Sequence, residues 1–213
     1  MKKYIFTIMI MLAMSTMAIS QTKKGVQSPN YNNPLASVIW CGFNTDDLAN
    51  HLCIAHLECD SQSYWIRFEI VYPYNIKEMR DSDGRPTYGK YSISKGKHLY
   101  LKLANEEIIK LTCTYQTQKY VDNYISNTGI YKEYDIDSYF LLTSSQIDLL
   151  SKDPSLSSIS KIRMELLYDV IDGTNIDCQD FKTTYNKITG IKEEKLAEKE
   201  TQRQKNANPL KDF

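Results

Sequence analysis

The sequence lacks an excess of charge of either sign: lysine and arginine total 26, and aspartate and glutamate also total 26. A protein that binds nucleic acid collects phosphates on a strongly basic surface, so this balance argues against that class. It also offers no acidic excess that would select a cationic partner. We therefore expect no nucleic-acid partner.

Apolar runs long enough to cross a membrane are also missing. Residues 4–13 are apolar, but a membrane-spanning helix needs roughly 20 such residues to cross a hydrocarbon core of about 30 Å. Two lysines precede this stretch, and the small residues Ala18 and Ser20 stand before Gln21. This pattern is typical of a cleaved export signal, so we expect residues 1–20 to be removed. The mature chain should be periplasmic or extracellular, without a membrane span.

Groups that could perform catalysis are scarce. The chain has 3 histidines that could act as a general base, and no serine has the flanking glycines of a hydrolase nucleophile elbow. Glu69, Asp135 and Asp137 could supply acids for glycoside cleavage, but nothing in the sequence places two of them in one cleft. We therefore rank an enzyme below a binding protein.

Histidine and cysteine nevertheless gather in one segment, and both are zinc ligands. His51, Cys53, His56 and Cys59 fall within residues 51–59. In a helix the last three could share a face, whereas in a strand His56 would point away from the others. We favour packing or disulfide formation for these side chains and keep zinc as the alternative.

An odd number of cysteines leaves at least one without a disulfide inside the chain. If residues 51–59 form a strand, Cys53 and Cys59 lie about 20 Å apart, beyond the roughly 4.4–6.8 Å between the Cα atoms of a disulfide. Any bridge from either would reach another part of the fold, and buried thiols are the alternative. The five cysteines are Cys41, Cys53, Cys59, Cys113 and Cys178.

Alternation of apolar and polar residues predicts antiparallel strands through much of residues 36–182. The clearest strand covers residues 64–72, and a leucine-rich hairpin turns at residues 104–107. This order of elements predicts a single α+β domain built on an antiparallel sheet. Further strand patterns cover residues 38–43, 134–142 and 159–168.

Two segments are harder to assign. Residues 45–60 fit both helical spacing and strand alternation. A hairpin with residues 64–72 is slightly favoured, because the polar residues 60–63 can link the two segments. Residues 116–130 are polar and aromatic, and we expect a loop there.

A short helix should begin after Thr143. Its hydroxyl and the amide of Gln146, three positions later, match a capping box, and an apolar pair flanks them as a hydrophobic staple. Pro154 should end the helix. We therefore predict a helix near residues 144–152.

The two ends of the domain differ from its middle in composition. Residues 21–35 are polar, with two prolines, and should form a mobile lead-in. Residues 183–213 are strongly charged and should form a helix or a disordered tail, because their apolar stripe is narrower than the roughly 100° of a docked helix. A helix that binds a partner is the alternative for this tail.

Two acidic segments begin like calcium loops. Asp81–Gly84 has the start of an EF-hand, but the twelfth position of that loop is Ser92 and not glutamate. Asp172, Asn175 and Asp177 are similarly incomplete. We interpret both segments as turns, with a weak calcium site as the alternative.

Three segments resemble a layout found in small uncharacterised exported bacterial proteins. They are Ser92–Gly96 with the leucine-rich hairpin that follows, Leu142–Ile147 and Ile159–Glu165. The resemblance spans about residues 92–168. It implies an exported α+β protein and no assigned activity or site.

Tyrosine is abundant, with 16 residues against 2 tryptophans. Its rigid ring and polar end are enriched in binding surfaces, although they also suit ordinary strands. If the tyrosines near residues 115–139 share a face, they predict a patch that binds a glycan or a protein. These residues are Tyr115, Tyr120, Tyr124, Tyr131, Tyr134 and Tyr139.

These features favour an exported, non-catalytic binding or interaction module. A structural or assembly component of the cell envelope is the first alternative, and it would oligomerise through a sheet edge or the tail. A metal-assisted hydrolase is the second. The oligomeric state stays open at this point.

Overall fold

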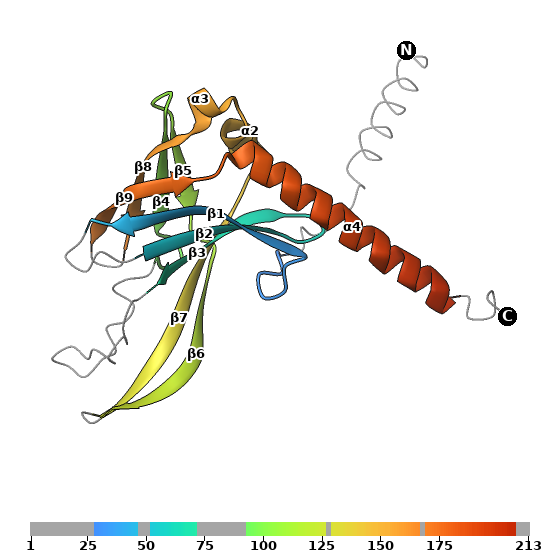
Figure 1. Ribbon diagram of the computed structural model, residues 1–213, viewed down its shortest axis with the longest axis horizontal. Coiled ribbons are helices and arrows are strands. Elements are labelled where there is room, and N and C mark those ends of the chain that lie inside the picture. The colour runs from blue at the N-terminus through green and yellow to red at the C-terminus, as the bar shows by residue number, and fades with distance from the viewer. Residues whose placement is uncertain (1–27, 47–51, 72–92, 127–128, 167–168, 208–213) are drawn as a thin grey trace, which may run out of the picture.

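The computed structural model describes residues 28–46, 52–71, 93–126, 129–166 and 169–207 (Figure 1). Within these ranges, strands alternate with hairpin turns, and helices occur only toward the C-terminal half. The helices are α2 (Ser144–Leu150), α3 (Pro154–Ser157) and α4 (Phe181–Ala207). The strands are β1 (Ala36–Thr45), β2 (Leu52–Cys59), β3 (Tyr64–Val71), β4 (His98–Leu103), β5 (Ile108–Thr112), β6 (Tyr115–Ser126), β7 (Gly129–Leu141), β8 (Ile159–Glu165) and β9 (Val170–Cys178).

The described strands form one nine-stranded sheet in the order β5-β4-β8-β9-β1-β2-β3-β7-β6. Every neighbouring pair is antiparallel. The sheet curls into a half-barrel, and just after β5 the amide of Thr114 donates to the carbonyl of Tyr139 in β7 at 2.8 Å. The predicted class is confirmed at this level: a mainly antiparallel sheet with a C-terminal helix and a few short helices.

The hydrophobic core lies on the inner face of the curled sheet. In β4, Leu99, Leu101 and Leu103 are buried and alternate with partly exposed residues, as a one-sided strand requires. Packing is tight between β1 and β9, because a Cβ on Gly173 would lie 2.7 Å from Cδ2 of Phe43. The core therefore admits only glycine at that position without a shift of the Phe43 ring.

The second and third strands form the hairpin that the sequence slightly favoured for residues 45–60. Cys53 pairs with Ile70 and Leu57 with Ile66, so the buried residues of both strands share the inner face. Strand pairing resolved the ambiguity, since periodicity alone suited a helix as well.

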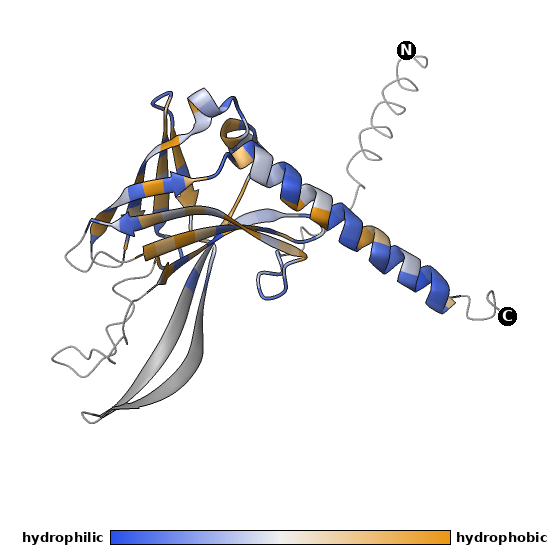
Figure 2. Ribbon diagram, viewed as in Figure 1, coloured by the Kyte–Doolittle hydropathy of each residue, from blue (hydrophilic) through white to orange (hydrophobic). Residues whose placement is uncertain are grey.

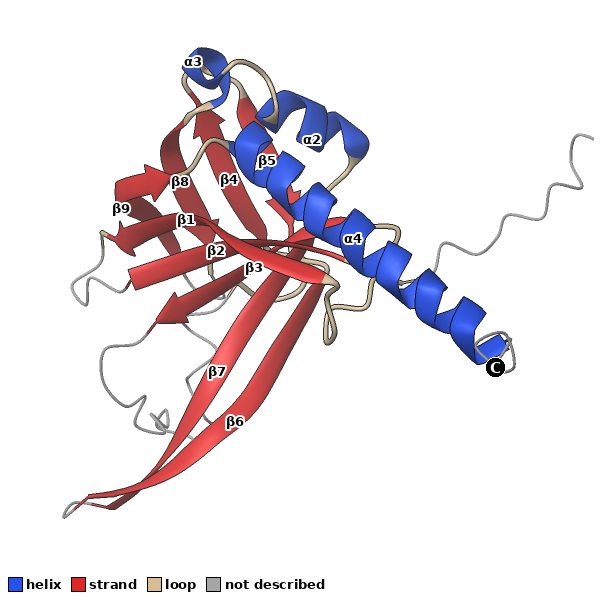
Figure 3. Cartoon of the chain, turned by 45° about the vertical axis from the view of Figure 1, so that its right-hand side comes forward, coloured by secondary structure: helices blue, strands red, loops and turns tan. Residues whose placement is uncertain are grey.

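The expected loop at residues 116–130 was wrong. β6 covers most of it and pairs with β7 from Tyr115 opposite Tyr139 to Ser126 opposite Gly129. Only the Asp137–Leu141 end of β7 pairs with β3. The rest of the β6–β7 hairpin extends away from the sheet as a two-stranded ribbon (Figure 3). The hydrogen bonds of this ribbon come from the partner strand, which local composition does not reveal.

The turn expected around Asp172, Asn175 and Asp177 was also wrong, because all three belong to β9. Asp177 pairs with Gly42 of β1, and Asp172 pairs with Arg163 of β8. The other proposed calcium segment, residues 81–92, lies outside the described residues.

The predicted capping box is confirmed at the start of α2. The amide of Gln146 donates to Oγ1 of Thr143 at 3.3 Å, and Oε1 of Gln146 accepts from the amide of Thr143 at 2.9 Å. Nε2 of Gln146 also donates to the carbonyl of Lys110 at 3.0 Å. The cap therefore fixes α2 against the edge strand β5.

Part of the expected lead-in contacts the sheet. Residues 21–27 lie outside the described residues, but the amide of Leu35 donates to the carbonyl of Cys59 at 2.7 Å. The Tyr31 ring lies 5.1 Å from the Trp65 ring and 5.0 Å from the Tyr139 ring, measured between centroids. Residues 28–35 thus dock, because one aromatic side chain supplies the apolar surface that their composition otherwise lacks.

The charged tail forms the long helix α4, and its first half packs on β1 and β2. Phe181, Thr184 and Ile188 are buried, and the Phe181 ring contacts Trp40 at 5.3 Å between centroids. The apolar stripe of residues 183–213 was too narrow to predict docking. The helix, however, begins before that charged segment, at Phe181, and this ring enlarges its buried face. Figure 2 shows that α4 is mostly hydrophilic along its length. No helix within the described ranges is long and apolar enough to span a membrane.

Candidate functional site

The outer face of the sheet, opposite the core, contains two groups of charged side chains. The first, which we call the Arg67 cluster, lies on β2, β3 and β7 and consists of His56, Glu58, Arg67, Glu69 and Asp137. The second, which we call the Tyr100 face, lies on β4, β5, β8 and β9. Its residues are His98, Tyr100, Lys102, Ile108, Lys110, Lys161, Arg163, Glu165, Val170 and Asp172.

In the Arg67 cluster, three carboxylates surround one guanidinium. Nε of Arg67 lies 2.8 Å from Oε1 of Glu58, and Nη1 lies 2.5 Å from Oε2 of Glu69 and 3.1 Å from Oδ1 of Asp137. Glu69 and Asp137 are direct neighbours across β3 and β7. Two of the three acids considered for glycoside cleavage therefore do meet, but with an arginine bridging them.

Glu58 is fully occupied by hydrogen bonds from the fold. Its carboxylate accepts from Nε1 of Trp65 at 2.9 Å, from Oγ of Ser37 at 2.9 Å and from Arg67. Only 3% of Glu58 is exposed. Because these donors already engage both of its oxygens, we interpret Glu58 as a structural group and not as a general base.

Two groups in this region have shifted pKa values. Burial, assisted by the charge of Asp137, raises the pKa of Tyr139 to about 12, so its phenol stays neutral. His56, whose Nε2 lies 3.9 Å from Oε1 of Glu69, is the main cause that lowers the pKa of Glu69, ahead of Arg67. Glu58, Glu69 and Asp137 all contact Arg67, so each carboxylate of the cluster already has a cationic partner.

Two of the six tyrosines of the predicted patch, Tyr115 and Tyr139, pack within the fold. Tyr139 is buried at 2% exposure, and Tyr115 stacks on Tyr31 with a centroid distance of 5.2 Å. Tyr31 also contacts Trp65, so these rings belong to one aromatic cluster of the fold. The other four occupy paired positions in the ribbon, with Tyr120 opposite Tyr134 and Tyr124 opposite Tyr131.

The zinc candidates are divided between the two faces of β2. Cys53 and Cys59 are buried on the inner face, whereas His56 lies on the outer face in the Arg67 cluster. His51 lies outside the described residues. Within the part of the chain that the structure describes, no group of three or more histidine, cysteine or acidic side chains could hold a metal ion.

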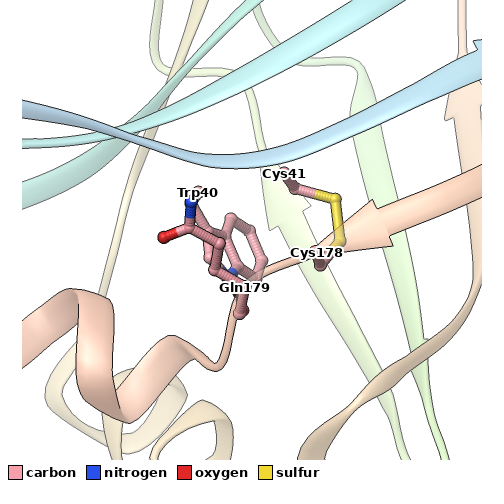
Figure 4. The surroundings of a disulfide bond; sticks show 4 residues. All are labelled: Trp40, Cys41, Cys178 and Gln179. Atoms are coloured by element: carbon pink, nitrogen blue, oxygen red, sulfur yellow. Dashed lines mark hydrogen bonds between the residues drawn. A yellow bond between two sulfur atoms is a disulfide. The ribbon is translucent and has the colours of Figure 1, made fainter.

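A disulfide joins Cys41 and Cys178, and its two cysteines are 137 positions apart in the sequence. It links β9 to β1, and β1 lies in the sheet between the strands of the two charged groups. Beside it, Nε1 of Trp40 donates to the carbonyl of Gln179 at 3.0 Å (Figure 4).

Cys59 and Cys113 are buried thiols, and burial raises the pKa of both. Their thiolates are therefore disfavoured.

The Tyr100 face is a regular grid because four strands lie in register. One row places Ile108, Lys102 and Lys161 side by side on β5, β4 and β8. In the next row, Tyr100 stands between Lys110 and Arg163. Cross-strand neighbours on one face lie roughly 5 Å apart, so Lys102 and Lys161 are adjacent like charges.

Ion pairs hold several of these cations in place. Asp172 accepts from Nε of Arg163 at 2.6 Å and from Nη2 at 2.9 Å, and Nζ of Lys161 lies 2.7 Å from its carboxylate. The hydrogen bond from Arg163 is the main cause that lowers the pKa of Asp172 to about 2. Nδ1 of His98 lies 2.5 Å from Oε2 of Glu165.

The grid encloses a shallow surface hollow with a volume of about 510 Å³. Two of the residues that line this hollow are exposed aliphatic side chains: Ile108 is 64% exposed and Val170 is 56% exposed. Ligand sites commonly combine apolar walls with a few placed polar groups. This hollow has that composition, with an aromatic ring at its centre and cations on its strands.

Sequence reasoning did not identify this face. The alternation of Lys161, Arg163 and Glu165 with buried residues marked one strand as one-sided, but β4 and β8 are separated by some sixty residues. Only their pairing brings Tyr100 next to Arg163.

Comparisons with protein-family models, with curated proteins and with solved structures each found no match. Function is therefore inferred from the geometry of the site.

Proposed function

We propose that the chain is an exported, non-catalytic binding module and that the Tyr100 face is its contact surface. The observation that carries this proposal is the hollow on that face, which combines a central tyrosine, two exposed aliphatic side chains and several cations. The Arg67 cluster supports the same interpretation indirectly, because its carboxylates are already engaged by donors of the fold.

Export is supported by two independent features. The first twenty residues have the pattern of a cleaved signal. The Cys41–Cys178 disulfide suits a periplasmic or extracellular compartment, since cytosolic thiols are kept reduced.

An NMR titration of the ¹⁵N-labelled mature chain tests the proposed surface. The probes are three soluble oligomers of similar length: a neutral oligosaccharide, an acidic oligosaccharide and an acidic peptide. We expect at least one probe to cause saturable shifts of amide signals centred on β4 and β8. Shifts centred on β2 and β3, or no saturable shift with any probe, would contradict the proposal.

Two variants with a common chemistry sharpen this test. Ile108→Ser removes an aliphatic side chain that lines the hollow and should weaken binding. Leu156→Ser is the control, because it removes an aliphatic side chain that is 46% exposed but lies on α3, outside the hollow, and it should leave binding unchanged. Equal loss of binding in both variants would mean that the shifts do not report on the hollow.

A second candidate, a structural or assembly component of the cell envelope, is favoured by one observation. Among the described strands, β6 is a sheet edge and pairs only with β7. Edge strands present backbone groups that can pair with another chain. Light scattering of the mature protein tests this candidate, which predicts a concentration-dependent oligomer and is contradicted by a monomer at all concentrations.

A further inference from the structure

The charges of the Tyr100 face are more concentrated than the balanced composition of the chain suggests. Lys102 and Lys161 are cross-strand neighbours, and the next row adds Lys110 and Arg163. Like charges directly opposite each other destabilise a sheet. Glu106 and Asp172 offset part of this cost through ion pairs with the two lysines. An anionic ligand would offset it further.

Carboxylates also belong to the face, and they limit which anion fits. Glu165 lines the hollow, and Asp172 stands beside Arg163 in the same row. Asp172 stays ionised because its pKa is lowered to about 2. An ionised carboxylate can only accept hydrogen bonds. The ligand should therefore present hydroxyl donors as well as negative charges.

The apolar part of the hollow selects for carbon-rich surfaces. The Tyr100 ring is only partly buried, and Nζ of Lys110 lies 5.9 Å from its centroid. Ile108 and Val170 border the hollow on β5 and β9. Aromatic and aliphatic side chains in this arrangement can contact the C–H faces of a ring-shaped ligand.

We infer that the ligand of the Tyr100 face is an acidic polysaccharide, a conclusion that rests on the proposed function of this face. A polymer of sugar acids supplies carboxylates for Lys102 and Lys161, hydroxyls for Glu165, whose side chain is 29% exposed, and C–H surfaces for Tyr100. Double-stranded DNA fits less well, because its backbone has phosphates but no hydroxyl groups along it that could donate to Glu165. An anionic membrane fits less well too, because the two exposed aliphatic residues lie on separate strands and not in one continuous patch.

Isothermal titration calorimetry with defined polymers tests this inference. The probes are polygalacturonate, neutral dextran of similar length, double-stranded DNA and phosphatidylglycerol vesicles. We expect measurable affinity for polygalacturonate, at least about tenfold weaker binding of dextran and DNA, and a decline in affinity as salt increases.

Charge-reversal variants locate the binding. Lys161→Glu should weaken polygalacturonate binding by about tenfold, because it places a negative charge beside Lys102. Lys199→Glu changes the net charge equally on the exposed part of α4 and should leave the affinity within about twofold. An equal loss in both variants would overturn the inference, since it would indicate attraction by net charge alone.

Glu165→Ala separates sugar recognition from simple attraction of anions. Removing a carboxylate from a cationic surface should tighten the binding of any polyanion if charge alone acts. If Glu165 accepts hydrogen bonds from sugar hydroxyls, the variant should instead bind polygalacturonate several-fold more weakly. Urea unfolding of each variant establishes that the fold is retained. Tighter binding by folded Glu165→Ala would overturn the inference.

The outcomes distinguish the two levels of the proposal. If dextran binds the Tyr100 face as tightly as polygalacturonate, the face remains a contact surface but its ligand is a neutral glycan. If DNA or vesicles bind more tightly than polygalacturonate, the acidic polysaccharide is excluded. If none of these probes and none of the NMR probes binds at this face, both the inference and the proposed function fail.

Discussion

The Arg67 cluster and the Tyr100 face occupy the same side of one sheet, yet their charged residues have different surroundings. Glu58 is 3% exposed and its carboxylate has three donors, whereas the Arg163 side chain is 51% exposed. The first group has three carboxylates around one guanidinium, and the second is rich in cations. An outward position in a strand therefore does not guarantee contact with solvent.

The difference follows from what packs beside each group. Trp65, Tyr139 and Tyr31 form an aromatic cluster next to Arg67, in which Trp65 donates to Glu58 and Tyr139 donates to Asp137. On the Tyr100 face, Ile108 and Val170 are more than half exposed. Electrostatic interactions are stronger in the low dielectric of a buried site, so the same ion pair matters more in the Arg67 cluster.

The strongest test of this comparison is to remove one arginine from each group. Arg67→Met leaves Glu58 and Asp137 buried without their cation, so the free energy of unfolding should fall by about 3 kcal/mol or more. Arg163→Met on the open face should cause the much smaller loss typical of an exposed ion pair. Urea unfolding of both variants measures the difference. Similar losses would show that the two groups share one environment.

The disulfide joins β9 of the Tyr100 face to β1, the strand between the two groups, and should have the next largest effect. Replacing both Cys41 and Cys178 by alanine should lower the free energy of unfolding by about 2–4 kcal/mol, because the bridge restricts a long loop in the unfolded chain. Peptide mapping without reductant should recover the two cysteines in one linked peptide. Cys113→Ala provides a comparison in which a buried thiol is lost without a crosslink. A double variant no less stable than Cys113→Ala would contradict this assignment.

Truncation of one tyrosine beside each group sharpens the comparison further. Tyr31→Ala should lower the free energy of unfolding by about 2 kcal/mol, less than the roughly 3–5 kcal/mol for a fully buried aromatic residue. Tyr100→Ala should cost about 1 kcal/mol or less, because this partly buried ring lies on the outer face and outside the core. Thermal unfolding followed by circular dichroism compares them. If Tyr31→Ala were as stable as the native chain, the packing of Tyr31 on Trp65 and Tyr139 would not stabilise the fold.

Alkaline pH should weaken the Arg67 cluster through Tyr139. Its pKa is raised from 10.0 to about 12, so the unfolded chain releases this proton more readily than the folded one. Below pH 10 the neutral phenol makes its full contribution to the free energy of unfolding, and this contribution is lost as the pH rises toward 12. Stability of the native chain should therefore fall more steeply over this interval than that of Tyr139→Phe. Parallel curves would exclude the effect.

Acid should affect the Tyr100 face, and this is the smallest expected change. The pKa of Asp172 is lowered from 3.8 to about 2, so its contribution is present above pH 4 and disappears as the pH falls toward 2. Unfolding measured from pH 5 to pH 2 should show a slightly steeper loss for the native chain than for Asp172→Asn. The effect is modest because solvent screens this exposed carboxylate. An identical pH dependence in both would contradict it.

Much of the fold could be predicted from local pattern. Alternation identified the strands that contain the buried leucines of β4 and the one-sided β8, and Thr143 with Gln146 identified the start of α2. The ribbon of β6 and β7 could not be predicted in this way, because its polar composition suits a loop until a partner strand satisfies its backbone. β9 was missed for the same reason.

The sites illustrate the limits of spacing as a guide. Cys53, His56 and Cys59 are neighbours in the sequence, yet β2 places His56 on the other face from the two cysteines. Conversely, Tyr100 and Arg163 are distant in the sequence and adjacent in the sheet. Strand register, and not sequence distance, determined which side chains could act together.

The sequence by itself determined the features that depend on a few consecutive residues: the balance of charge, the alternation that makes each strand one-sided, the capping box and the pattern of an export signal. The tertiary structure decided which strands became neighbours, and therefore the pairing of Cys41 with Cys178, the burial of Glu58 beside Arg67 and the assembly of the Tyr100 face. The physical reason is that local patterns reflect hydrogen bonding and burial within one element. The energy of a cross-strand contact depends on a partner strand, whose distance along the chain local pattern does not set.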